Sequence, residues 1–131
     1  MVVAALAPWH DNHAAARAAL RDTRPSLIAH VAYETTAVLS RMPEGHRIAP
    51  AIVAEALRGF PARWLTLDGI RARRALDRAI AAGLRGGALY DALIAATAAH
   101  HGATLVSADR RARRIYDALG ADVTYVGTTG G

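Results

Sequence analysis

The sequence predicts an α/β sandwich around a mostly parallel sheet. Short apolar segments alternate with longer amphipathic or Ala-rich segments along most of the 131 residues. Gly and Pro punctuate these segments evenly, and no internal repeat or low-complexity linker interrupts them. Such alternation is typical of strands that helices connect into a parallel sheet. The length suits one core, so a single domain over residues 1–131 is expected, with residues 127–131 as a loose tail.

Five strands are expected, because five short apolar runs are each bounded by Pro, Gly or a polar residue. They cover Val2–Leu6, Ser26–His30, Arg63–Leu67, Ala103–Ser107 and Asp122–Val126. Six helices are expected between and after them, over Asp11–Arg21, Ala32–Arg41, Pro50–Arg58, Ile70–Ala82, Ala88–His101 and Asp109–Leu119. Pro at a first helical turn and Gly directly after a last turn set several of these ends.

The charge of the chain favours a polyanionic partner. All sixteen basic residues are Arg, against eleven carboxylates, which leaves a net charge of +5. This surplus suggests RNA, DNA or an acidic protein segment as partner. GC-rich coding explains the choice of Arg over Lys more readily than the surplus itself.

Several function classes are excluded by features that the sequence lacks. The chain has no cysteine, which excludes a disulfide scaffold, a zinc ribbon, an iron–sulfur site and a thiol nucleophile, and fits a reducing cytoplasm. No apolar run reaches the about 18 residues that span a bilayer, so no membrane partner is expected.

Three carboxylates stand where ligands of a parallel sheet bind, beyond the carboxyl ends of the strands. Glu34 is expected in the first turn of the helix after the second strand, Asp91 in the first turn of a strongly apolar helix, and Asp109 between the fourth strand and the last helix. Each alone is explained by helix capping or the helix dipole. Together they repel one another unless a cation lies between them. Carboxylate oxygens suit Mg²⁺ or Mn²⁺, which can activate water for phosphodiester hydrolysis.

The histidines carry weaker signals. His10 and His13 flank a loop-to-helix junction at a spacing that differs from that of a helical zinc site, and no Glu base accompanies them. We therefore expect local structure there rather than a metal. His30 lies close enough in sequence to Glu34 to reach the same cleft.

Four segments, taken in order, form a recognisable set. They are Val2–Leu6 with its exit through Ala7–His13, Ala32–Thr35 around Glu34, Tyr90–Ala95 around Asp91, and Leu105–Arg111 around Asp109. The set resembles the PIN-domain ribonucleases of the VapC toxin type, over essentially the whole chain. The resemblance implies a PIN-like three-layer sandwich whose central, mostly parallel sheet is flanked by helices.

The resemblance also implies a function. Glu34, Asp91 and Asp109 would hold Mg²⁺ or Mn²⁺, and Ser107 would position a water or a phosphate. The protein would be an endoribonuclease that leaves 5′-phosphate and 3′-hydroxyl ends. The residues implied to hold the RNA backbone are Arg110, Arg111, Arg113 and Arg114. Members of this family commonly form homodimers, and a small antitoxin protein keeps them inactive.

One departure from the family pattern leaves alternatives open. The family's first strand carries an Asp ahead of the run that corresponds to Val2–Leu6, and Asp11 does not replace it, because it lies beyond Pro8. We expect the natural protein to begin upstream, with a fourth acid. The missing acid favours a second interpretation, a catalytically impaired PIN-like module that binds RNA or the antitoxin. The basic helices suggest a third, a DNA-binding regulator, although these Ala-rich helices are separated by strands.

Overall fold

The structure, a computed structural model, describes residue 6 and residues 10–23, 25–59, 61 and 63–126. The described residues divide into two compact units, one that ends at Trp64 and includes Val126, the other from Leu65 to Tyr125. The expected tail, 127–131, and all of the expected first strand except Leu6 lie outside the described residues. Leu6 itself is helical rather than extended, and it packs against the core of the first unit.

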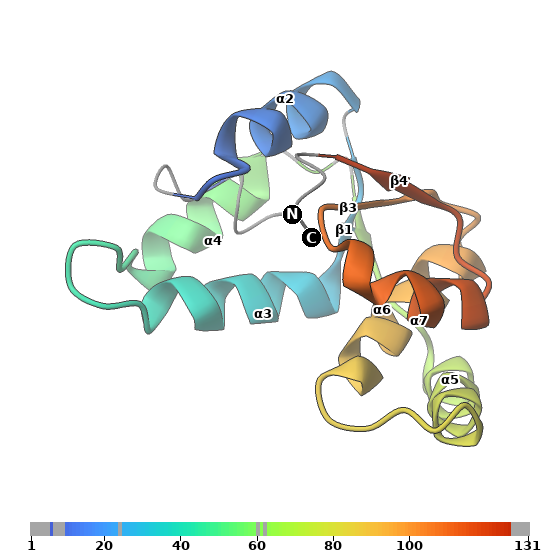
Figure 1. Cartoon of the computed structure of the whole chain (residues 1–131). Coiled ribbons are helices and arrows are strands. Elements are labelled where there is room, and N and C mark those ends of the chain that lie inside the picture. Colours follow the sequence, from blue (N-terminus) through green and yellow to red (C-terminus); the bar gives the residue numbers. More distant parts are fainter. Residues whose placement is uncertain (1–5, 7–9, 24, 60, 62, 127–131) are drawn as a thin grey trace. The chain divides into compact units, whose positions relative to one another are not determined.

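The first unit is built on two helices that pack against each other, α3 (Ala29–Ser40) and α4 (Pro50–Gly59) (Figure 1). Buried residues recur at helical spacing on the inner face of α3, and Val53 and Leu57 do the same on α4. This periodicity drives the packing, because each helix buries a single apolar stripe. The shared core consists of Leu27, Ala32, Leu39, Val53 and Leu57.

A third helix and two short strands lie in this part of the chain. Helix α2 covers His13–Thr23. Strand β1 (Leu27–Ile28) pairs with β2 (Trp64–Leu65), which lies where the first unit ends. The N–H of Leu27 donates to the carbonyl oxygen of Arg63 at 2.9 Å.

The expected strand Ser26–His30 is wrong in its second half. Only Leu27 and Ile28 are extended, and α3 begins at Ala29, three residues before the expected start at Ala32. Ala is the best helix former, and the apolar residues after Ile28 fit one helical stripe as well as a strand. Glu34 consequently lies in the second turn of α3, not in the first as expected, and one turn beyond His30.

The second unit surrounds a parallel strand pair. Strand β3 (Leu105–Ser107) runs parallel to β4 (Val123–Tyr125), in the register Leu105–Val123 and Ser107–Tyr125. Helix α5 (Gly69–Ala81) packs on α6 (Ala88–His100), which also packs on α7 (Arg113–Ala118) (Figure 1). A short 3₁₀ helix, η1 (Arg110–Ala112), precedes α7. The parallel pair confirms the predicted strand direction.

The core of this unit is made mainly of alanines. Its buried members are Ala79, Ala92, Ala95, Ala112, Tyr116, Leu119 and Ala121. Small side chains let the helices approach closely, so that one large ring, that of Tyr116, fills the space under β3 and β4 together with leucines.

Several predicted boundaries shift for local reasons. Helices α4, α5 and α6 match the expected segments within one residue at each end. Helix α2 starts two residues later than expected, because the chain first turns at residues 10–12. The expected helix Asp109–Leu119 is split into η1 and α7, and the strands are shorter than the apolar runs that predicted them. Among the helices in the described ranges, none is long and apolar enough to cross a membrane.

Candidate active site

Asp91 lies in the first turn of α6, as the sequence predicts. The helix begins after Gly87, whose carbonyl oxygen accepts the N–H of Asp91 at 3.4 Å. Asp91 is half-buried, and Ala92 and Ala95 behind it are buried in the core. The helix dipole favours a carboxylate at this end. Packing of the alanine face therefore holds the acid at the rim of the second unit.

Asp109 follows β3 directly and begins η1. Its carboxylate Oδ1 accepts the backbone N–H of Arg111 at 3.0 Å, which confirms the predicted cap. Its own N–H donates to the hydroxyl oxygen of Ser107 at 3.0 Å. These two bonds fix the turn between β3 and η1 and leave the Asp109 side chain exposed to solvent.

Tyr116 links these residues, and the sequence analysis did not single it out. Its hydroxyl lies 3.4 Å from the hydroxyl of the buried Ser107. Burial raises the pKa of Tyr116 above 10.0; the hydrogen bond to Ser107 opposes this rise, and the charges of Asp91 and Asp109 add to it. Both carboxylates therefore lie within electrostatic reach of one hydroxyl group.

A signal for Tyr116 is present in the sequence. Ala112, Tyr116 and Leu119 form an apolar stripe at helical spacing, and all three are buried. A hydroxyl carried by a core stripe needs a hydrogen-bond partner. The partner, Ser107, is nine residues away in sequence, which is why the pattern alone did not identify it.

Glu34 belongs to the first unit and forms a local ion pair. Its Oε1 lies 3.0 Å from Nε2 of His30, one helical turn earlier on α3, and the Glu34 side chain is 46% exposed. His30 thus lies beside Glu34, and their position in one shared cleft stays a prediction. Within the described residues, no group of three or more His, Asp or Glu side chains is arranged to hold a metal ion. The convergence of Glu34 with Asp91 and Asp109 stays a prediction.

Two other histidines contact the backbone. Nδ1 of His10 accepts the N–H of Asn12 at 3.1 Å, which closes the turn before α2. Nε2 of His101, at the end of α6, lies 2.8 Å from the carbonyl oxygen of Thr66. The His10 contact is the local structure that the sequence predicts there.

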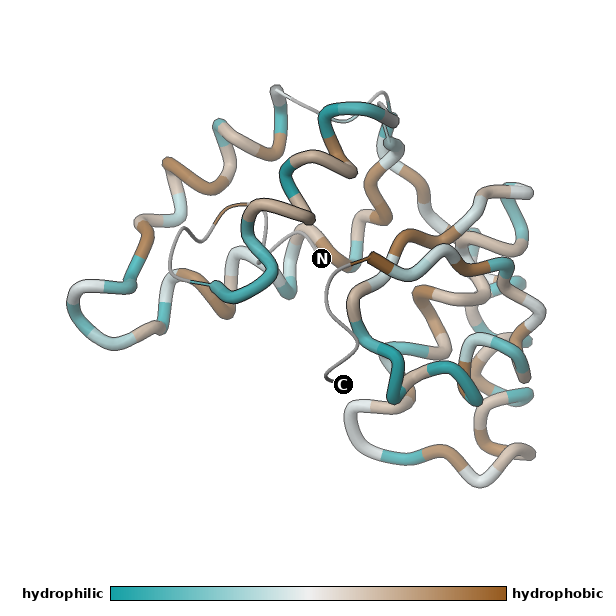
Figure 2. Tube along the Cα trace, turned by 45° about the horizontal axis from the view of Figure 1, so that its top comes forward, coloured by the Kyte–Doolittle hydropathy of each residue, from teal (hydrophilic) through white to brown (hydrophobic). Residues whose placement is uncertain are grey.

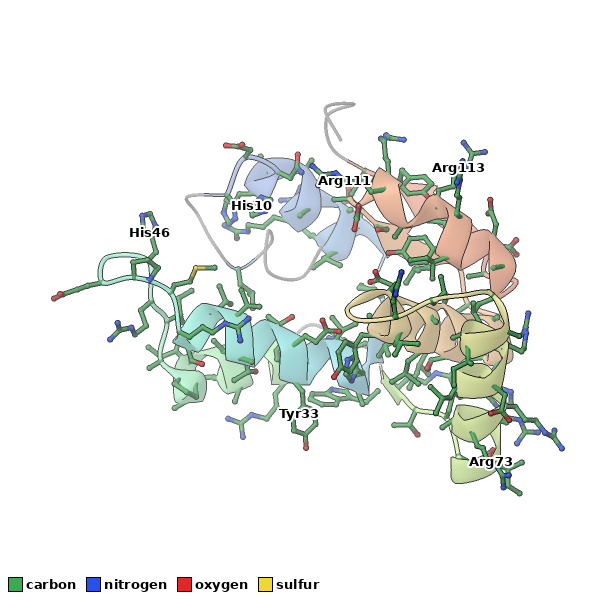
Figure 3. The ribbon with its side chains drawn as sticks, turned by 60° about the horizontal axis from the view of Figure 1, so that its bottom comes forward. His10, Tyr33, His46, Arg73, Arg111 and Arg113 are labelled. Carbon is green, nitrogen blue, oxygen red and sulfur yellow. The ribbon has the colours of Figure 1, made fainter. Side chains whose placement is uncertain are left out.

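The four candidate RNA-binding arginines form a hydrophilic run from η1 into α7 (Figure 2). Arg111 and Arg113 extend from this segment in Figure 3. Arg110 stacks on the ring of Tyr125, with its Cζ 5.1 Å from the ring centroid. Arg113 lies 3.9 Å from Asp117 in an exposed ion pair, which contributes little to stability. Arg111 and Arg114 are exposed.

Side chains of the second unit carry oxygen atoms that suit a hard cation. Asp91 and Asp109 offer carboxylate oxygens, and Ser107 and Tyr116 offer hydroxyls. Mg²⁺ commonly binds proteins through one or two carboxylates and keeps several waters. Neither thiolate nor imidazole, the ligands typical of zinc, is part of this set. The chemistry of these side chains therefore suits an oxygen-bound divalent ion, and their gathering around one stays a prediction.

The chain is similar in sequence to proteins of a known family. The family model described as PIN domain matches residues 1–118. The chain is 41% identical over 127 residues to "Ribonuclease VapC40" of Mycobacterium tuberculosis (strains CDC 1551 / Oshkosh and ATCC 25618 / H37Rv), covering 96% of this chain and 94% of that protein. It is 38% identical over 115 residues to "Ribonuclease VapC27" of strain ATCC 25618 / H37Rv, covering 87% of this chain and 83% of that protein. No solved structure matches the chain.

Proposed function

Because the chain belongs to the PIN domain family, we propose that it is a metal-dependent endoribonuclease that acts as the toxin of a toxin–antitoxin pair. The observation that supports this proposal is the position of Asp109 at the carboxyl end of the parallel strand β3, held there by its N–H bond to Ser107. Its relatives are named ribonucleases, and ligands of parallel sheets bind at that end of the strands.

The cofactor of the proposal is Mg²⁺ or Mn²⁺. Asp91 and Asp109 would hold it, with Glu34 from the first unit as the third carboxylate. When bound, such an ion supplies an activated water and stabilises the charge that leaves with the cleaved phosphodiester. The hydrogen bond from the Asp109 N–H to Ser107 keeps the carboxylate at the end of β3. Ser107 retains a hydroxyl proton for Tyr116 or for a phosphate oxygen.

Substrate and partners follow from the same proposal. Arg110, Arg111, Arg113 and Arg114 would contact RNA phosphates, because the planar guanidinium can bind two phosphate oxygens at once. A cognate antitoxin would keep the enzyme inactive, the protein would form a homodimer, and it would act in the cytoplasm.

Metal-dependent cleavage of RNA by the whole chain tests the proposal. We expect Mg²⁺ or Mn²⁺ to support cleavage, and Asp91→Asn to reduce the rate by at least about 100-fold, because a metal ligand loses its charge. Asp77→Asn is the matched control, since Asp77 is an exposed residue of α5. Cleavage that persists in Asp91→Asn, or that falls equally in Asp77→Asn, contradicts the assignment.

A second function is favoured by one observation. Among the described residues no three-ligand group is arranged for a metal, as expected for a PIN-like module that binds RNA or the antitoxin without cleaving. Such a module would bind labelled RNA equally well in Mn²⁺ and in EDTA, and would leave the RNA intact in both. Metal-dependent cleavage by the same preparation excludes this alternative.

A further inference from the structure

A pocket of about 500 Å³ lies between the η1–α7 segment and β4 in the second unit. Its lining residues are Arg110, Arg113, Asp117, Ala121, Asp122, Val123 and Tyr125. Resting on the function proposed above, we propose that this pocket is a ribonucleotide subsite, which holds one nucleotide of the RNA strand next to the cleavage position. The volume lies within the range of ordinary small-molecule sites.

The pocket adjoins the candidate active site through covalent and cross-strand neighbours. Arg110 follows Asp109 in the chain, and Tyr125 is the register partner of Ser107 across the parallel pair. Paired strands lie about 4.8 Å apart. A nucleotide in the pocket can therefore belong to the same RNA strand as a phosphodiester bound at Asp109.

One wall of the pocket is cationic and held in place. The guanidinium of Arg110 stacks on the Tyr125 ring, which fixes its plane. In the described part of the chain, no carboxylate lies within ion-pair distance of Arg110. Among the same residues, Nε of Arg110 and the hydroxyl of Tyr125 are buried without a hydrogen-bond partner. Buried polar groups normally have partners, so this pair marks a place where a polar ligand, or a small shift that it induces, supplies them.

Two acidic residues also line the pocket, and they decide the class of ligand. Asp117 and Asp122 line the same pocket as Arg110 and Arg113. A bare phosphate would be attracted by the arginines and repelled by the carboxylates. A ribonucleotide has a group for each kind of lining residue. Its phosphate accepts hydrogen bonds from guanidinium groups, and its 2′-hydroxyl donates one to a carboxylate. The exposed Arg113–Asp117 pair is weak, so Arg113 can turn to a phosphate.

The 2′-hydroxyl provides the decisive comparison, because DNA lacks it. The experiment measures fluorescence anisotropy of one labelled single-stranded oligonucleotide, as RNA and as DNA, with the full chain in EDTA, so that nothing is cleaved. We expect the wild-type protein to bind the RNA about tenfold more tightly, the effect of one hydrogen bond to a charged group. Asp122→Asn should remove most of this preference, even as the loss of a charge that repels phosphate raises the affinity for both RNA and DNA.

Arg113→Gln tests the phosphate contact. We expect it to weaken RNA and DNA binding alike, and by more than Arg73→Gln, which removes the same charge from α5. Figure 3 shows Arg73 and Arg113 at opposite ends of the second unit. Circular dichroism of each variant verifies folding, which exposed substitutions of this kind rarely disturb.

Three results would overturn the subsite. They are equal binding of RNA and DNA by the wild-type protein, an unchanged preference in Asp122→Asn, and equal effects of Arg113→Gln and Arg73→Gln. An unaffected nucleic-acid affinity in Arg113→Gln would assign the pocket to an acidic protein partner instead. Failure of the subsite is distinct from failure of the enzyme assignment, because metal-dependent cleavage that is lost in Asp91→Asn stands without it.

Discussion

The hydroxyl of Tyr116, on α7, lies 3.4 Å from the hydroxyl of Ser107, the last residue of β3. Ser107 in turn accepts the backbone N–H of Asp109 at 3.0 Å. A core tyrosine is thus connected through one serine to the residue that begins the basic segment. If Asp109 holds a metal ion, this connection predicts that Tyr116 is a positioning residue for it.

Tyr116→Phe removes the hydroxyl and keeps the ring in the core. We expect the free energy of unfolding to fall by about 1 kcal/mol, the net value of one hydrogen bond, and RNA cleavage to slow by about tenfold, as for the loss of a group that orients a metal ligand. Urea unfolding and an initial-rate assay measure the two effects. Tyr33→Phe is the control, because Tyr33 is 78% exposed; equal effects in both variants would contradict the positioning role.

Alkaline pH should destabilise the protein through Tyr116. Its folded-state pKa is raised above 10.0, mainly by burial, so the folded protein holds this proton more tightly than the unfolded chain does. The stabilisation is fully present below about pH 10 and is lost as pH rises through the folded-state pKa. Urea unfolding of wild type and Tyr116→Phe across this range should show the wild-type protein losing stability relative to the variant. A difference in the free energy of unfolding that stays constant across this pH range would contradict the predicted titration of Tyr116.

Glu34→Gln tests whether the first unit contributes to the candidate site. If Glu34 is the third ligand, we expect cleavage to fall by at least about 100-fold and to be partly restored by excess Mn²⁺. Glu55→Gln, on the exposed side of α4, removes an equal charge and should cleave as the wild-type protein does. Normal cleavage by Glu34→Gln would restrict the site to residues of the second unit.

Substitutions at two glycines distinguish the effect of backbone strain on stability from the effect of side-chain packing. Gly102 follows α6 at φ 62°, whereas Gly87 precedes α6 at φ −59°, and a Cβ added at either position meets no atom within 4 Å. Gly102→Ala should therefore lower the free energy of unfolding by about 1 kcal/mol, because an L-residue is strained in the left-handed region. Gly87→Ala should leave it unchanged or raise it by about 0.5 kcal/mol. Chemical denaturation measures both, and equal losses would contradict this explanation.

The candidate acids were predictable in part from local patterns. Asp91 in the first turn of α6 and Asp109 as a cap both follow from residues within one turn of them. The predicted position of Glu34 in its helix was wrong by one turn, because the apolar run around Ile28 and Ala29 is compatible with either a strand or a helix. Short apolar runs carry this ambiguity wherever flanking Gly or Pro does not resolve it.

By itself, the sequence determined the α/β class, the helical segments, the basic run after β3 and the resemblance to the PIN family that the comparisons confirm. Only the tertiary structure decided that Tyr116 is bonded to Ser107 within reach of both acids, and that Tyr125 pairs in register with Ser107 and stacks on Arg110. The reason is physical: helix periodicity and caps act between residues within one or two turns. Strand register and core hydroxyl pairing join residues distant in sequence, whose contact exists only after the core has packed.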